Sequence, residues 1–191
     1  MRVLIAGGGI GGLTAALAFD HFGHECSVIE QSGVLSEIGA GIQLSPNGMH
    51  VLSKLGVSAQ IARHAFRPKA LEMRMGRSGT RLFDIPLRKA AINRWGADYL
   101  HVHRADLIQA LSDTLATRQP NALRLGAKVT SYEQDDAGVH AVLDSGERVS
   151  GDLLVGADGI HSAIRAKMLG PDGCGLDGIQ TPCGDLSSEG R

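Results

Sequence analysis

Residues 2–12 read RVLIAGGGIGG, an apolar run that passes directly into glycines. The apolar part is short and continuous, which is typical of a strand buried on both faces of a parallel sheet. Residues 13–22 are rich in alanine and leucine and predict a helix that ends at Gly23. Residues 26–30 predict a second strand, so we expect the N-terminus to form a βαβ unit.

Three glycines in this stretch stand in the register GxGxxG between the expected strand and helix. Gly7 suits the tight turn, Gly9 lets a diphosphate approach the backbone, and Gly12 lets the helix pack closely on the sheet. The start of the helix offers free N–H groups and a partial positive charge to phosphates. We include Ile10 and Gly11, which lie between these glycines, in the candidate site. The pattern predicts a site for a dinucleotide.

Glu30 ends the second strand at nearly the spacing expected for an acidic residue that binds a ribose, about 20 residues after the glycines. Its carboxylate can accept hydrogen bonds from ribose hydroxyls and would repel a 2'-phosphate, which makes NADP a poor candidate. We include the next residue, Gln31, in the candidate site. The alternative is a glycine turn followed by a solvated glutamate. The motif alone does not separate FAD from NAD.

The rest of the chain continues in an α/β pattern. A glycine-rich loop is expected at 39–48, and 71–75 with 80–85 predict a hairpin that belongs to a second layer or subdomain. The residues after 170 lack periodicity and are expected to be irregular. The remaining predicted helices are 49–55, 57–64, 105–117 and 160–169, and the remaining strands are 99–103, a short one near 123, 129–133, 139–143 and 152–155.

Composition excludes several classes of protein. The chain has 191 residues with 43% hydrophobic and 20% charged residues, and no apolar run approaches the roughly 20 residues that cross a bilayer. A net charge of -1 gives no field that would attract nucleic acid. Three separated cysteines suggest neither a disulfide framework nor a zinc site. The N-terminus lacks the pattern of a signal peptide, so we expect a cytoplasmic protein.

Residues 152–165 read DLLVGADGIHSAIR. The run Gly156-Ala157-Asp158-Gly159, with Ser162 and Arg165, resembles the Asp-Gly fingerprint of the class A flavoprotein monooxygenases, which are FAD-dependent aromatic-ring hydroxylases. In that family the aspartate helps organise the diphosphate region of the flavin and the approach of the reduced pyridine nucleotide. The resemblance implies this role for Asp158 and FAD as the cofactor. A strand that ends in an ordinary turn would explain Asp158 and Gly159 alone.

Three further segments resemble the same family. Residues 103–107, HRADL, are similar to a strand-to-helix junction whose arginine contacts FAD, which implies that role for Arg104. Residues 39–42, including Gly41, are similar to the loop beside the isoalloxazine ring. Val129 falls where the family contacts the adenine side through backbone atoms. A surface arginine, an ordinary loop and a core valine are the alternative interpretations.

The resemblance implies a Rossmann-like FAD-binding α/β fold of the glutathione-reductase type. It predicts an FAD-binding domain at 1–172 that contains part of a β-rich substrate subdomain at about 66–100, and then an irregular tail at 173–191. The activity implied is hydroxylation of an aromatic acid with NADH or NADPH and O₂, through a flavin C4a-hydroperoxide. Within the family the chain looks most similar to salicylate, 3-hydroxybenzoate and 6-hydroxynicotinate hydroxylases.

Two departures from the family pattern limit what the resemblance implies. Some relatives place a histidine proposed as the base where this chain has Gln43, and an amide cannot take a proton at neutral pH, so we name no catalytic residue. Family members run to roughly twice this length, and their Gly-Asp motif is missing here. We therefore expect a truncated chain. The oligomeric state is left open.

Several alternatives stay open from the sequence. The chain is either part of an enzyme or a non-catalytic remnant that binds a dinucleotide without turnover. An NAD-dependent dehydrogenase is a third possibility, which residues 152–165 disfavour. We predict no metal site, because His101 and His103 have no third ligand beside them. For Trp95 and Tyr99 we expect core packing rather than contact with substrate.

Overall fold

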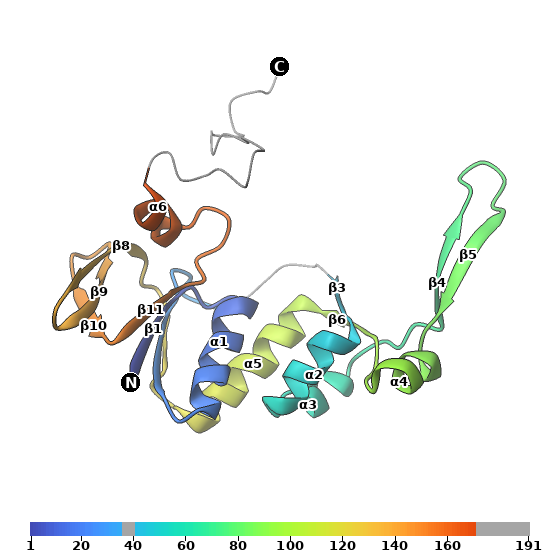
Figure 1. Cartoon of the computed structure of the whole chain (residues 1–191), viewed down its shortest axis with the longest axis horizontal. Coiled ribbons are helices and arrows are strands. Elements are labelled where there is room, and N and C mark those ends of the chain that lie inside the picture. Colours follow the sequence, from blue (N-terminus) through green and yellow to red (C-terminus); the bar gives the residue numbers. More distant parts are fainter. Residues whose placement is uncertain (36–40, 171–191) are drawn as a thin grey trace, which may run out of the picture.

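The computed structural model describes residues 1–35 and 41–170 of the chain. The helices and strands form three layers, of which the middle one is a parallel sheet, with an elongated extension beside them (Figure 1). This arrangement confirms the expected α/β fold. The predicted tail at 173–191 lies outside the described residues.

The central layer is a four-stranded sheet in the order β11-β1-β2-β7, with every neighbouring pair parallel. Val3 lies opposite Leu153 on one side and opposite Cys26 on the other. The side chains of residues 3–6 are fully buried, as the continuous apolar run predicted. The strands are β1 (Arg2–Ala6), β2 (Glu25–Ile29), β7 (Leu123–Arg124) and β11 (Leu153–Gly156).

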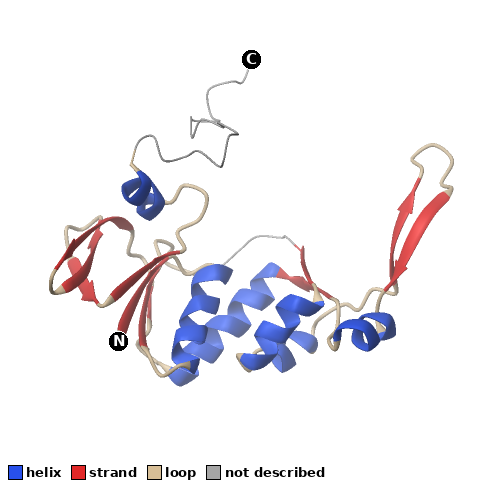
Figure 2. Ribbon diagram, in the orientation of Figure 1, coloured by secondary structure: helices blue, strands red, loops and turns tan. Residues whose placement is uncertain are grey.

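Two helices, α1 (Ile10–His21) and α5 (Arg104–Arg118), pack against each other on one face of this sheet (Figure 2). The predicted helix at 105–117 is confirmed, and its apolar side chains are buried there. Figure 1 shows that both helices start toward the same end of the pair. The larger core includes Val3, Ile5, Leu13, Leu17, Leu107, Leu111 and Leu115.

The opposite face is covered by an antiparallel sheet in the order β10-β9-β8 and by a short helix, α6 (Ala163–Leu169). A second core there joins Leu4 and Ile29 of the parallel sheet to Ala141 and Leu143. The three strands are β8 (Val129–Asp135), β9 (Gly138–Leu143) and β10 (Arg148–Gly151).

The extension begins at a strand pair, β3 (Gly41–Leu44) with β6 (Leu100–His103). It continues through α2 (Pro46–Lys54), α3 (Ser58–Ala62), α4 (Lys89–Trp95) and the hairpin of β4 (Ala70–Arg74) with β5 (Arg81–Pro86), which projects from the rest of the molecule (Figure 1). Cross-strand partners on this hairpin include Leu71 with Ile85 and Met73 with Phe83, and all four side chains are exposed.

Several boundaries differ from the sequence predictions. The first helix begins at Ile10 instead of residue 13, and its first turn contains Gly11 and Gly12. The last helix begins at Ala163 instead of residue 160. Residues 41–44 form a strand rather than a loop because β6, about 60 residues later, pairs with them. Helix α4 and strand β10 were missed. Pairing with a distant segment decides the strand at 41–44, and local patterns do not show it.

Candidate functional site

The glycine turn between β1 and α1 is closed by backbone contacts on both sides. The Gly7 N–H donates to the Ile29 carbonyl at 2.8 Å, and the Ala157 N–H donates to the Ala6 carbonyl at 2.8 Å. Gly7 has φ +105°, and a β-carbon there would lie 2.3 Å from the Ala157 oxygen. Only glycine fits this position. The turn therefore lies tightly between the ends of β2 and β11.

The other two glycines of the motif have opposite surroundings. A β-carbon on Gly12 would lie 1.9 Å from the Gly7 carbonyl oxygen, so the helix can approach the turn only because that atom is missing. A β-carbon on Gly9 would meet nothing within 4 Å. Gly9 is the N-cap of α1, and no side chain of the described residues caps it. The first-turn N–H groups of this 12-residue helix thus border open space, an arrangement that suits an anion.

The carboxylate of Glu30 lies directly beside the glycine turn. Its Oε2 accepts from the Gly8 N–H at 2.6 Å, and its Oε1 accepts from the Ser32 N–H at 2.8 Å. A carboxylate has about four lone-pair sites, so these two bonds orient the group and leave it able to accept from ribose hydroxyls. Gln31, between Glu30 and Ser32, is exposed.

Asp158 follows β11 and is engaged by the start of α6. Its Oδ1 accepts from the Ser162 hydroxyl at 2.5 Å, and its Oδ2 accepts from the N–H groups of Ala163 at 2.8 Å and Ile164 at 3.2 Å. Ser162 in turn accepts from the Arg165 N–H at 2.9 Å. These bonds fold the Asp-Gly loop into a fixed shape and hold Ala157 against Gly7.

The structure therefore brings Gly7, Gly9, Gly12, Glu30 and Asp158 together at the carboxyl edge of the parallel sheet. This edge is where ligands bind in open α/β sheets. The open space at Gly9, the first-turn N–H groups and the oriented carboxylate fit a diphosphate and its ribose.

The other predicted site residues occupy neighbouring elements. Arg104 is the first residue of α5 directly after β6; it is half-buried, with its Nε fully buried. Gly41 starts β3 opposite His103. Val129 starts β8 with a buried side chain, so its backbone is what it can offer to a ligand.

Sequence reasoning missed one residue of the turn and was wrong about an aromatic side chain. Gly8 supplies the N–H that orients Glu30, and a β-carbon there would lie 2.9 Å from Cβ of Glu30. The run of three consecutive glycines at 7–9 is the sequence feature that could have indicated a role for Gly8. Trp95 was expected in the core, but its side chain is 44% exposed.

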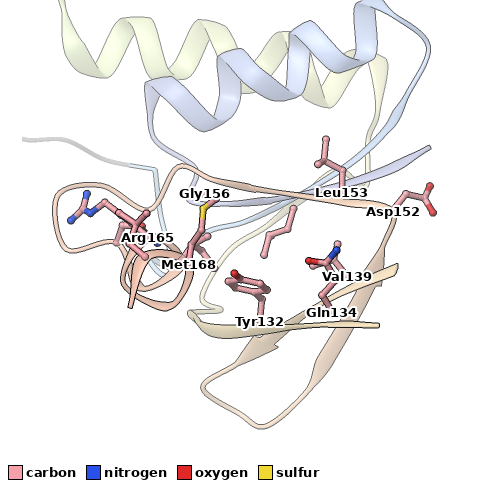
Figure 3. Close-up of a pocket in the computed structure, with 12 residues that line it drawn as sticks. Tyr132, Gln134, Val139, Asp152, Leu153, Gly156, Arg165 and Met168 are labelled. Carbon is pink, nitrogen blue, oxygen red and sulfur yellow. Dashed lines mark hydrogen bonds between the residues drawn. The ribbon is translucent and has the colours of Figure 1, made fainter. Parts of the chain in front are cut away.

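Two cavities lie near these elements. One, of about 440 Å³, runs beside the edge strand β11 on the face of the sheet away from α1, among Tyr132, Met168 and Arg165 (Figure 3). The other, of about 520 Å³, lies between α2 and the hairpin, and Trp95 and Tyr99 line it with apolar residues around them. The Tyr99 hydroxyl donates to the Gln43 side-chain oxygen at 2.8 Å, which links this cavity to β3.

Residues 1–173 match the family described as FAD binding domain. The chain belongs to this family. PtnB3, a 3-amino-4-hydroxybenzoate 2-monooxygenase from Streptomyces platensis, is 39% identical over 169 residues, which cover 88% of this chain and 42% of that protein. The 3-hydroxybenzoate 6-hydroxylase 1 of Aquipseudomonas alcaligenes is 34% identical over 195 residues, which cover 100% of this chain and 50% of that protein.

Solved structures agree with this assignment. A variant of HpxO from Klebsiella pneumoniae, complexed with FAD, has a TM-score of 0.75 and 32% sequence identity, over 87% of this chain and 42% of that chain. The resemblance to class A flavoprotein monooxygenases is confirmed, as are the FAD-binding fold and FAD as the cofactor. This chain spans about half or less of the length of these proteins. Within residues 1–35 and 41–170, no helix is both long and apolar enough to span a bilayer.

Proposed function

We propose that this chain holds FAD for a monooxygenase that uses NADH or NADPH and O₂ to hydroxylate a small aromatic acid. The observation that carries the proposal is the convergence of Gly9, Glu30 and the Asp158 loop at one edge of the sheet in a chain of the FAD-binding family. Bound FAD would supply electron transfer from the reduced pyridine nucleotide to O₂. The similar proteins named as hydroxybenzoate monooxygenases support an aromatic acid as the substrate.

The site residues divide this task by position. The N–H groups at Gly9, Ile10 and Gly11 face the diphosphate, and the glycines at 7 and 12 hold the helix close enough for them to reach it. Glu30 accepts from the adenosine ribose, with Gln31 beside it. We assign the adenine side to the Val129 backbone, the flavin contacts to Arg104 and Gly41, and the shape of the diphosphate loop to Asp158.

The substrate side of the proposal rests on the cavity between α2 and the hairpin. Its wall of Trp95, Leu87 and Ile85 suits a planar apolar ring. The Tyr99–Gln43 hydrogen bond connects this wall to the strand that begins at Gly41. We therefore assign about 66–100 to part of a substrate subdomain within an FAD-binding domain of 1–172. A cytoplasmic location belongs to the same proposal, since the reaction consumes reduced pyridine nucleotide.

The first test measures FAD binding by the purified chain. We expect FAD to bind with a shifted visible spectrum, and we expect addition of an aromatic acid to stimulate NAD(P)H oxidation by the FAD-loaded protein. The second candidate function is a remnant that binds the dinucleotide without turnover. Bound FAD with no NAD(P)H oxidation stimulated by an aromatic acid would support the remnant.

The second test uses Trp95, the only tryptophan in the chain, as a reporter for the cavity. Titration with 3-hydroxybenzoate should quench its fluorescence in a saturable way. Tyr99→Phe, which removes the bond to Gln43, should weaken the binding, while Tyr132→Phe in the other cavity should leave it unchanged. A linear, non-saturating response would remove the cavity from the proposal and leave the FAD site untouched.

A further inference from the structure

The backbone of Glu30 is fixed by the segment that follows β7. The Glu30 N–H donates to the Arg124 carbonyl at 2.9 Å, and the Glu30 carbonyl accepts from the Ala127 N–H at 3.0 Å. The Gly126 N–H donates to the Ser32 carbonyl at 3.0 Å, next to the N–H that orients the Glu30 carboxylate. The position of the carboxylate thus depends on where residues 124–127 lie.

This supporting segment has little sheet structure of its own. Strand β7 has two residues, lies at the edge of the parallel sheet and pairs with β2 through Leu123 and Arg124, with one more bond from the Val28 N–H to the Ala122 carbonyl at 2.6 Å. The backbone bonds to Glu30 and Ser32 attach the segment to the end of β2, but a two-residue edge strand has few ladder bonds to fix its exact position. The side chain of Arg124 adds a contact to the antiparallel sheet.

Arg124 forms a two-point ion pair with Glu147, in the turn between β9 and β10. Nη1 donates to Oε1 and Nη2 donates to Oε2, both at 2.6 Å. The Arg124 hydrogen bonds hold the pKa of the Glu147 carboxyl below its ordinary value. The turn itself is fixed, because the Leu143 N–H donates to the Glu147 carbonyl and the Asp144 N–H donates to the Lys128 carbonyl, each at 2.9 Å. The pair therefore ties the edge of the parallel sheet to the antiparallel sheet.

We propose that the Arg124–Glu147 ion pair is a positioning device for Glu30, and that it sets how well this domain recognises the adenosine ribose of its dinucleotide. The inference rests on the proposed role of Glu30. Both side chains of the pair are nearly half exposed, at 44% and 46%, and such pairs contribute little to global stability. The two parallel hydrogen bonds of the pair fix the relative position of the two sheets. A fixed position is what the Glu30 carboxylate needs in order to accept a hydrogen bond from a ribose hydroxyl.

The test compares ADP with its 2'-deoxy and 3'-deoxy forms by calorimetric titration of the whole chain. The Glu30→Gln variant first identifies the hydroxyl that Glu30 recognises. The deoxy form that lacks this hydroxyl binds more weakly than ADP to the wild-type protein but as tightly as ADP to the variant. For that hydroxyl we expect the wild-type protein to prefer ADP by about tenfold, as removal of a hydrogen bond to a charged group implies. Arg124→Ala and Glu147→Ala should each lower the ratio of the affinity for ADP to the affinity for that deoxy form toward one.

Two controls separate positioning from general stability. The exchanged pair, Arg124→Glu with Glu147→Arg, should restore most of the preference. Arg148→Ala breaks a different surface ion pair of the same antiparallel sheet, Arg148 with Glu133, and should leave the preference unchanged. Thermal unfolding of each variant confirms that it is folded.

The outcomes are distinct. If Arg124→Ala weakens ADP and its deoxy forms by the same factor, the pair is merely structural and the inference is wrong. If Glu147→Ala leaves ADP binding and the preference intact while Arg124→Ala lowers both, Arg124 acts on the ligand directly, which also overturns it. If the wild-type protein does not bind ADP, or Glu30→Gln changes no preference, the proposed role of Glu30 has failed instead.

Discussion

The carbonyl oxygen of Gly7 lies 1.9 Å from the place where Gly12 would carry a β-carbon. Only four residues lie between these glycines in the chain, yet Gly7 directly follows β1 and Gly12 lies in the first turn of the helix that packs on the sheet. The contact lets α1 start directly beside the turn, with its N–H groups toward the site.

Gly12→Ala should destabilise the protein by about 3 kcal/mol or more, because backbone atoms must move to admit the methyl group. Thermal unfolding should show a Tm about 10 °C lower. Gly11→Ala is the matched control, since a β-carbon there meets nothing within 4 Å and alanine favours the helix. A Gly12→Ala protein as stable as Gly11→Ala would contradict the close packing.

Gly9→Ala should lower FAD affinity at least tenfold while changing stability by no more than about 1 kcal/mol. The residue has φ -71°, which alanine adopts freely, and its β-carbon would enter the open space in front of α1. Fluorescence titration with FAD and urea unfolding measure the two effects separately. Unchanged FAD affinity would show that the diphosphate does not approach this glycine.

Asp158→Ala should destabilise the start of α6 by about 1–2 kcal/mol, as loss of a helix cap does. The variant removes the acceptor for the Ala163 and Ile164 N–H groups, so these amides should exchange faster with solvent in hydrogen-exchange measurements. Ser162→Ala should expose the Arg165 amide instead. Equal exchange in all three proteins would mean that the Asp-Gly loop does not depend on these bonds.

Cys26 should react slowly with iodoacetamide in the folded protein. Its side chain is 4% exposed, and burial, together with the charge of Asp20, raises the pKa of the thiol. The reactive thiolate is therefore scarce and hard to reach. Mass spectrometry in a Cys174→Ser, Cys183→Ser background should show rapid labelling only after urea is added. Rapid labelling without urea would mean that the start of β2 opens readily.

The Asp135 carboxylate should contribute to stability in a way that depends on pH. The Ala137 N–H and then His140 lower its pKa in the folded protein below the ordinary 3.8. The contribution is therefore present above that value and is lost as the pH falls through the lowered folded pKa. Urea unfolding of wild type and Asp135→Asn from pH 6 to 3 should show a difference that shrinks toward pH 3. A difference that grows on acidification would reverse the sign.

The sequence predicted the central part of the site because the signals there are local. Glycines at 7, 9 and 12 specify a turn and a close approach that other residues cannot make, and the apolar run of 3–6 specifies a buried strand. Along the chain, a strand is followed by the glycines, a helix, a second strand and an acidic residue. This order permits few arrangements of the backbone. The Asp-Gly segment selected FAD over NAD by resemblance, and the family match confirmed it.

Tertiary structure alone decided the features that join distant segments. Ala157 lies against Gly7 although 150 residues separate them, and Arg124 reaches Glu147 across 23 residues. The strand at 41–44 and the exposure of Trp95 likewise depend on what the chain places beside them. Local sequence fixes backbone preferences over a few residues, whereas these contacts form only when separate elements pack together.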